Sequence, residues 1–356
     1  MLARIRPDLA AFRAYASARA GIDAPIRLNA NESPIDLRGT SDGWNRYPDP
    51  QPVDLKRRLA TLYGVDAAQL WIGRGSDEAI DLLLRAFCRA GRDNVVTPAP
   101  TFGMYRVGAR LQGAECRELT LDPGDGFELD PERLIALTDA DTKLVFVCSP
   151  NNPTGTLRHD ALAFLARRLR DRALLVVDEA YVEFAGVPSA TTLLDRFDNV
   201  AVLRTLSKAH ALAGARVGAL IASAEIAALI GRIAAPYPLP APCVELARTA
   251  LEPASLEAAR ARVQRLVAER RRIAGALASI SDVVELWPSA ANFVLARFVD
   301  ARRAFDRLLA AGIVVRDFGA EPGLDGCLRI TIGTRDENDA LLDALLTREQ
   351  ARAAVS

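Results

Sequence analysis

The chain is poor in histidine, cysteine and lysine, and the first two shortages exclude whole classes of site. Its 356 residues contain two histidines and five cysteines, and no two cysteines form a CxxC pair. A zinc centre built from the usual His and Cys ligands is therefore not expected, and we predict no metal. The odd number of cysteines, most of them beside apolar residues, is typical of reduced thiols in a cytoplasmic protein.

Net charge and long apolar segments are also missing. The 45 basic residues of the Lys and Arg types balance 45 acidic ones. A protein that binds nucleic acid as its main function needs a basic excess, so we expect no nucleic-acid partner. No window of 18 apolar residues occurs, and the first residues lack the apolar run of a signal peptide. We therefore expect neither a membrane span nor export.

Short apolar runs that alternate with helical patterns predict an α/β fold. The expected strands are residues 94–97, 115–121, 143–148, 173–177, 199–203 and 217–221. Apolar residues recur with helical spacing before the first of them, at Ile80, Leu83, Leu84 and Phe87, and between others, at 161–169. Such alternation implies a large domain with a mostly parallel, mixed sheet sandwiched by helices.

Prolines 236, 238, 240 and 242 interrupt this rhythm, because four prolines in seven residues cannot continue a helix. We place a domain boundary there, with a large domain at 41–240 and a smaller α+β domain at 241–356. The smaller domain should open with a long helix. Its expected strands are 283–286, 292–298, 313–316 and 327–332, with a helix at 301–311. Residues 1–40 form an arm or join the smaller domain.

Reactive side chains follow two of the predicted strands. Asp178 follows strand 173–177, and Lys208 comes shortly after strand 199–203. The chain has only three lysines against 42 arginines, and arginine cannot form a Schiff base, so Lys208 amid small residues is a candidate catalytic amine. A semi-buried Asp178 needs a cation, which is either an arginine or a protonated ring nitrogen. Tyr181 lies three residues on and could donate its phenol to the same ligand.

Two segments are candidates for binding a phosphate. Ser76, a predicted N-cap, and Asp77 open a helix after two glycines, and free N–H groups at a helix start bind anions. A capped helix after a tight turn would look the same. Ser207 and Arg216 flank the lysine and could clamp a phosphate.

Two further residues are candidates for contact with a flat ligand. Phe102 follows a predicted strand and could stack on a heterocycle, although ordinary core packing is the alternative. Asn152 lies in a loop with two prolines, where its amide could bond a ligand oxygen or close its own turn.

In their order along the chain, these segments resemble fold-type-I pyridoxal phosphate (PLP) enzymes of the aspartate aminotransferase superfamily, and within it the histidinol-phosphate aminotransferase group. The matching segments are 28–34, 46–49, 75–78, 102–105, 152–155, 177–181, 207–208 and 328–334. The resemblance implies PLP as cofactor and a homodimer with its active site at the subunit interface.

The resemblance also implies a role for each candidate. Lys208 would bind the cofactor and move a proton, Asp178 would pair with the ring nitrogen, and Phe102, a tyrosine in many relatives, would stack on the ring. Asn152 and Tyr181 would bond the ring hydroxyl. The implied phosphate contacts are Ser76, Asp77, Ser207 and Arg216, with Tyr47 of the partner chain.

For the substrate, the resemblance implies contacts from Arg329, Arg316 and Asn31. Arg329 is similar to the superfamily arginine that binds a carboxylate, and Arg316 would be a second cation for a phosphate. An ion pair of Arg316 with Asp317 or another acid is the alternative interpretation.

The implied reaction is transamination between a phosphorylated amino alcohol, L-histidinol phosphate, and a 2-oxo acid, 2-oxoglutarate. Its products are imidazole-acetol phosphate and L-glutamate, a step of histidine biosynthesis in the cytoplasm. Two alternatives keep the fold: an aminotransferase for aromatic amino acids, and a lyase that resembles threonine-phosphate decarboxylase. A cofactor-binding protein without catalysis is a third, which the candidate lysine argues against.

Overall fold

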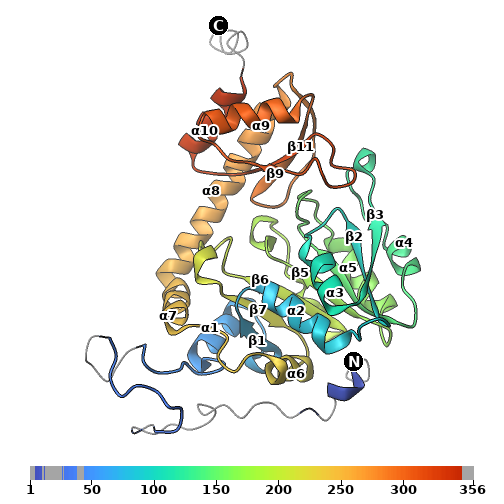
Figure 1. Ribbon diagram of the computed structural model, residues 1–356. Coiled ribbons are helices and arrows are strands. Elements are labelled where there is room, and N and C mark those ends of the chain that lie inside the picture. Colours follow the sequence, from blue (N-terminus) through green and yellow to red (C-terminus); the bar gives the residue numbers. More distant parts are fainter. Residues whose placement is uncertain (1–4, 10–11, 13–25, 27, 38–43, 347–356) are drawn as a thin grey trace.

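A seven-stranded sheet forms the centre of the computed structural model, which describes residues 5–9, 12, 26, 28–37 and 44–346 (Figure 1). In order across the sheet, the strands are β1 (Leu70–Gly73), β7 (Gly218–Ile221), β6 (Val200–Thr205), β5 (Leu174–Asp178), β4 (Thr142–Cys148), β2 (Asn94–Ala99) and β3 (Glu115–Thr120). Of these seven, β7 runs opposite to the other six. Strands β4, β5 and β6 are buried along their whole length, as in a parallel sheet that is covered on both faces.

Helices cover both faces of the large sheet. The helices on one face are α1 (Val53–Tyr63), α4 (Pro131–Ala136), α5 (His159–Arg168) and α7 (Ala241–Ala250), and those on the other are α2 (Ser76–Phe87), α3 (Met104–Gln112) and α6 (Ala224–Ile233). Successive strand residues point to opposite faces, so Val145 and Val147 join the first core while Leu144 and Phe146 join the second. The predicted α/β sandwich is confirmed.

The start of α2 corrects one prediction. Gly75 is the N-cap, with φ 81°, and Ser76 is the first helical residue. The chain turns sharply between β1 and α2, and this turn needs a positive φ that glycine adopts without strain. Ser76 was therefore wrongly predicted as the cap.

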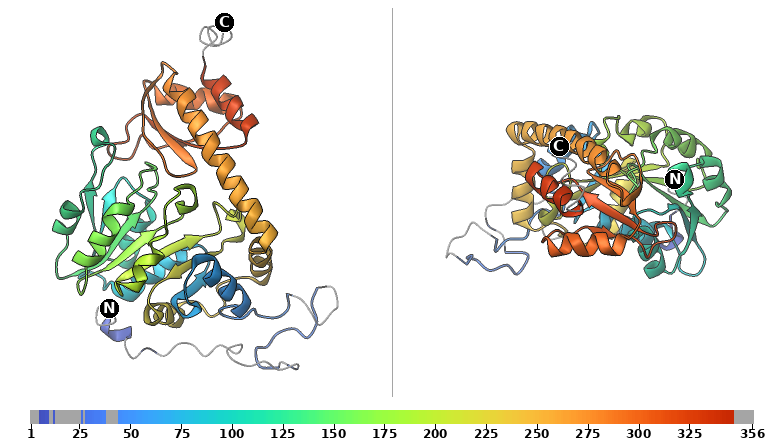
Figure 2. Two further views of the ribbon diagram at one scale, coloured as in Figure 1. Left: turned by 180° about the vertical axis from the view of Figure 1, so that it is seen from behind. Right: turned by 90° about the horizontal axis from the view of Figure 1, so that it is seen from above.

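A long helix, α8 (Pro253–Ala278), carries the chain away from the large sheet to a second, antiparallel sheet (Figure 2). Its strands, in order, are β10 (Arg316–Asp317), β11 (Cys327–Thr331), β9 (Phe293–Phe298) and β8 (Val283–Leu286), and helices α9 (Ala301–Ala310) and α10 (Arg335–Leu345) pack against them. The predicted strand 313–316 is wrong except at its end. The N–H of Ile313 bonds to the carbonyl of Leu308 at the end of α9, which keeps it out of the ladder.

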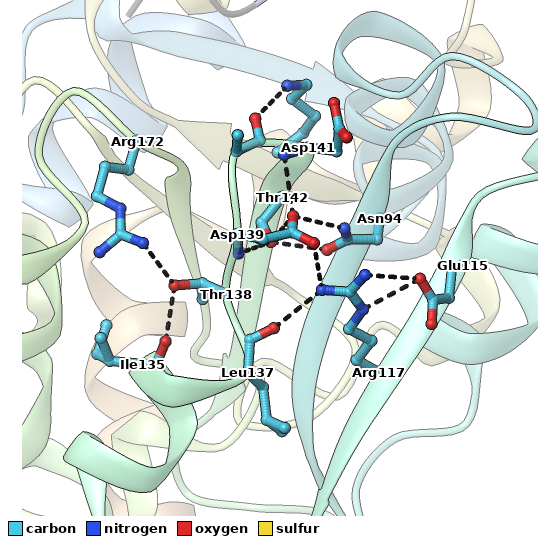
Figure 3. Close-up of polar contacts among 12 residues, drawn as sticks. Asn94, Glu115, Arg117, Ile135, Leu137, Thr138, Asp139, Asp141, Thr142 and Arg172 are labelled. Atoms are coloured by element: carbon cyan, nitrogen blue, oxygen red, sulfur yellow. Dashed lines mark hydrogen bonds and ion pairs between the residues drawn. The ribbon is translucent and has the colours of Figure 1, made fainter.

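A polar network ties the amino-terminal ends of β2, β3 and β4 together (Figure 3). Asp139 accepts hydrogen bonds from Asn94 at 2.9 Å and from Arg117 at 2.6 Å, and Thr142 bonds to both Asn94 and Asp139. These bonds, that of Asn94 first, hold the pKa of Asp139 well below its ordinary value. Structural contacts thus hold the end of the sheet at which these strands begin. The opposite end, where the strands finish, is left for a ligand. Among the described residues, no helix is long and apolar enough to cross a membrane.

Candidate active site

A cavity of about 570 Å³ lies at the carboxyl ends of the central strands. This is the edge at which open α/β sheets bind ligands. Among the described residues, all of the predicted site residues except Tyr47 and Asn31 line it: Ser76, Asp77, Phe102, Asn152, Asp178, Tyr181, Ser207, Lys208, Arg216, Arg316 and Arg329. Side chains that are up to 253 residues apart in the sequence, from Ser76 to Arg329, therefore meet at one place.

Parallel pairing brings the candidate amine and carboxylate to the same edge. Asp178 is the last residue of β5 and pairs in register with Leu203 of the neighbouring strand β6. Strand β6 ends at Thr205, and Ser207 and Lys208 follow directly. The two reactive groups thus come from adjacent strand ends because both strands run the same way.

The carboxylate of Asp178 is buried, with 3% of the residue exposed. Its Oδ2 accepts a hydrogen bond from the hydroxyl of Tyr105 at 2.8 Å, and its Oδ1 accepts one from the N–H of Ala180 at 3.1 Å. Burial raises the pKa of Asp178 to about 6, although these two bonds act in the opposite direction. No described lysine or arginine forms an ion pair with Asp178, so the alternative that an arginine neutralises it does not hold for this part of the chain.

The amine of Lys208 is open to the cavity, and its Nζ lies 5.8 Å from the centroid of the Tyr181 ring. Desolvation by the cavity walls lowers the pKa of Lys208, and the positive charge of Arg329 acts in the same direction. A lowered pKa raises the fraction of neutral amine, which is the nucleophilic form.

A tight cradle forms where β7 meets the start of α2. A Cβ atom on Gly218 would lie 2.4 Å from the carbonyl carbon of Gly75 and 2.5 Å from the nitrogen of Ser76, so only glycine fits. Arg216, with φ 53°, donates from Nη2 to Oδ2 of Asp77 at 3.0 Å. The N–H groups that open a twelve-residue helix and the guanidinium beside them suit an anion.

Ser207 completes this cradle from the lysine segment. Its hydroxyl bonds to the hydroxyl of Thr205 at 2.9 Å, and both residues line the cavity. The cradle therefore has a hydroxyl, a guanidinium and helix N–H groups on three sides.

Two arginines form the opposite wall of the cavity. Arg316 on β10 stands directly across from Arg329 on β11 in the strand register. Both guanidinium groups lie over the ring of Phe318, at 5.8 Å and 5.2 Å from its centroid. Arg329 also donates a short hydrogen bond to Oδ1 of Asn152. No described carboxylate pairs with Arg316, so the alternative ion pair with Asp317 is not formed within this part of the chain.

Burial lowers the pKa of Arg329, and the like charge of Arg316 lowers it further. Two like charges that face each other across paired strands repel. The arrangement is therefore one that an anion bound between the two groups would stabilise.

Tyr47 and Asn31 lie outside the cavity lining. The ring of Tyr47 stacks on Tyr237 at 4.4 Å, and its N–H donates to Oε1 of Glu32 at 2.7 Å. Asn31 is exposed, with φ 56°. Their predicted roles stay predictions.

Sequence reasoning missed several residues at this site. Tyr105, which bonds Asp178, lies one turn after Phe102, and that spacing was the available signal. Phe318 and Glu321 belong to the loop after β10 and carry no motif. Glu321 accepts a hydrogen bond from Arg106 on α3 at 3.2 Å. This contact links the loop after β10 of the small sheet to a helix that covers the large sheet.

Residues 20–345 match the family described as aminotransferase class I and II, and the chain belongs to this family. It is similar to the histidinol-phosphate aminotransferase of Stenotrophomonas maltophilia, with 53% identity over 99% of this chain and 98% of that protein. It is also similar to the histidinol-phosphate aminotransferase of Xanthomonas campestris pv. campestris, with 51% identity over 98% and 97%.

A solved structure supports the same relationship. The histidinol-phosphate aminotransferase from Sinorhizobium meliloti in complex with pyridoxal-5'-phosphate is 29% identical, with a TM-score of 0.78 over 91% of this chain and 90% of that chain. The fold assigned above is therefore that of a known PLP-binding enzyme.

Proposed function

We propose that the chain catalyses PLP-dependent transamination between L-histidinol phosphate and 2-oxoglutarate, giving imidazole-acetol phosphate and L-glutamate in histidine biosynthesis. One observation carries the proposal: a single cavity holds Lys208, the buried carboxylate of Asp178 and the facing pair of Arg316 and Arg329. The similar proteins named above are histidinol-phosphate aminotransferases, which favours this substrate over aromatic amino acids or a decarboxylation.

The residues of the cavity fit PLP. The start of α2 with Ser207 and Arg216 offers donors for its phosphate, Asp178 offers a carboxylate for its ring nitrogen, and Phe102 offers an apolar face for its ring. When bound, the cofactor supplies an electron sink for the negative charge that develops on the substrate carbon.

Side chains of the protein would bind and orient the cofactor and move the proton. Lys208 would hold the cofactor through a Schiff base at Nζ, and the same amine is placed to carry the proton away from the substrate carbon that bears nitrogen. Asp178 would pair with the ring nitrogen and hold it in its protonated form. Asn152 and Tyr181 orient the ring through its hydroxyl.

The arginine pair supports a phosphorylated substrate. A phosphate dianion can accept bonds from both guanidinium groups at once, which relieves the repulsion between Arg316 and Arg329. A carboxylate carries one charge and needs only one arginine. The second arginine is thus the residue that would bind the additional negative charge of a phosphate.

We also infer a homodimer in which Tyr47 reaches the cofactor phosphate of the partner subunit. Residues 28–37 project beyond the main body in both figures, and Leu28 and Leu37 are 91% and 100% exposed (Figures 1 and 2). Exposed apolar side chains on a projecting segment are typical of an interface with another subunit. Asn31 belongs to the same segment and is proposed to contact the substrate.

We also propose two domains, 41–240 and 241–356, with residues 1–40 as an arm or as part of the smaller one. The side chains that surround the small sheet form a core of their own between residues 273 and 345, which supports a separate second domain. Helix α7 at the start of 241–356 packs on the large sheet, so this support applies from α8 onward. A cytoplasmic location also stays a proposal. It is supported by the five cysteines, all of which are free thiols.

A substrate panel with purified protein tests the proposed reaction. We expect glutamate from 2-oxoglutarate with L-histidinol phosphate, and at least a hundredfold lower kcat/KM with phenylalanine or with unphosphorylated histidinol, since a charged group in the site loses its partner. Carbon dioxide release from a phosphorylated amino acid, or a preference for phenylalanine, would contradict the proposal.

Mixed dimers test the interface. Tyr47→Ala and Lys208→Ala chains are each expected to be impaired. Co-expression with two affinity tags should give mixed dimers with one restored site, because Tyr47 of one subunit serves Lys208 of the other. Mixed dimers no more active than the parent variants would show that Tyr47 acts within its own subunit, or not at all.

A further inference from the structure

The carboxylate of Asp178 has one side-chain partner among the described residues, and it is Tyr105. The Tyr105 hydroxyl lies 2.8 Å from Oδ2, and both residues are buried, with 0% and 3% exposed. The remaining contact is the backbone N–H of Ala180 on Oδ1. A carboxylate this far from solvent depends on such bonds, because bulk water cannot replace them.

Tyr105 is held rigidly from two sides. Its ring stacks on Phe146 of β4, with centroids 4.7 Å apart and planes 8° apart. The ring of Phe102 meets it edge-on at 5.7 Å. Burial, and then the charge of Asp178, raises the pKa of Tyr105 well above its ordinary value, so the phenol keeps its proton and acts as a donor.

Tyr105 does not line the cavity, although its neighbours Met104 and Val107 do. A ligand in the cavity therefore meets Asp178 and not Tyr105. The hydroxyl of Tyr105 therefore bonds Oδ2 from outside the cavity lining.

We propose that Tyr105 is the positioning residue for Asp178: its hydroxyl fixes the plane of the carboxylate and favours its charged form for pairing with the cofactor's ring nitrogen. The inference rests on the proposed function, in which that pairing occurs. A hydrogen bond to the charged form of an acid stabilises that form, and a fixed plane removes the rotation that ligand binding would otherwise have to arrest.

The test is Tyr105→Phe, which removes the hydroxyl and keeps both ring contacts. We expect the dissociation constant of PLP, titrated into the cofactor-free protein, to rise about tenfold, as for a lost hydrogen bond to a charged group. The kcat should fall by a similar factor while the KM for the amino donor changes less than about twofold.

Tyr63→Phe is the matched control. Tyr63 is another buried tyrosine, on α1 at the other face of the sheet, with its ring under Arg204. We expect this variant to bind PLP as the unaltered protein does. Circular dichroism and the unfolding temperature of each cofactor-free variant check that the fold is intact.

A double-mutant cycle separates positioning from structural support. In an Asp178→Asn background, Tyr105→Phe should cause no further loss of PLP affinity, because its effect passes through the carboxylate. The proposal would be overturned if Tyr105→Phe lowered PLP affinity equally in both backgrounds. It would also be overturned if the Tyr105→Phe variant bound PLP as tightly as the Tyr63→Phe control. Unchanged PLP affinity and turnover in Asp178→Asn alone would instead overturn the pairing of Asp178 with the cofactor, and this inference with it.

Discussion

Replacing Asp178 by asparagine should stabilise the cofactor-free protein at neutral pH, although it should impair the loaded enzyme. Burial raises the pKa of this carboxyl to about 6 from an ordinary value of 3.8, so the charged form is unfavourable in the folded state. Asparagine is neutral and keeps both contacts: its Oδ1 can accept from the Ala180 N–H, and its amide can donate to the Tyr105 oxygen.

The direction in which the free energy of unfolding changes with pH follows from the proton that Asp178 binds. Between about pH 4 and pH 6 the folded protein holds a proton on Asp178 that the unfolded chain has released, so the free energy of unfolding falls as pH rises through this window. The difference between these two pKa values corresponds to about 3 kcal/mol, and the loss levels off by about pH 7. Asparagine does not titrate, so the advantage of the variant over the unaltered protein should grow by this amount and then level off.

Urea unfolding of cofactor-free protein at pH 4, 5, 6, 7 and 8 measures this difference. Asp343→Asn, at an exposed position on α10, is the control for the loss of a surface carboxylate. Saturating PLP should reverse the order, because the cofactor stabilises the protein with the intact carboxylate more strongly. A difference for Asp178→Asn that is constant with pH, or one that shrinks as pH rises, would refute the reasoning.

Three further predictions concern the two ends of the cavity and the far edge of the sheet. Arg316→Gln should raise the KM for L-histidinol phosphate by about ten- to hundredfold and leave that for histidinol nearly unchanged; equal effects on both substrates would remove Arg316 from the phosphate site. Gly218→Ala should weaken PLP binding at least tenfold in a titration, because its Cβ would lie 2.4 Å from the carbonyl carbon of Gly75, and unchanged affinity would show that the cradle is looser than described. Asp139→Ala should lower the free energy of unfolding by about 1–3 kcal/mol, because it leaves the amide of Asn94 without an acceptor. The same variant should keep kcat within twofold. A large loss of kcat at unchanged stability would contradict a purely structural role for Asp139.

Strand ends were the most predictable part of the site. Apolar runs located six of the seven strands of the large sheet within two residues of their ends, because a buried parallel strand is apolar on both faces. Once the strands are parallel, Asp178 and Lys208 must meet at one edge, whatever the helices between them do. The scarcity of lysine then singled out Lys208.

Contacts that depend on packing between distant elements could not be predicted. Tyr105 reaches Asp178 only because α3 packs against β4, and 73 residues separate the two side chains. The facing of Arg316 and Arg329 depends on a two-residue strand, β10, which no periodicity can indicate. The role proposed for Tyr47 involves a second subunit, about which one chain's pattern says little.

The central claim is that Lys208 carries the cofactor, and the composition of the chain makes a direct measurement possible. Only Lys56, Lys143 and Lys208 can form the covalent link, and Lys143 lies buried 3.5 Å from Asp93. Reduction of the PLP-loaded protein with borohydride, followed by digestion and mass spectrometry, should place the added mass on the peptide that contains Lys208. Added mass on a peptide with Lys56 or Lys143, or no added mass at all, would contradict the account.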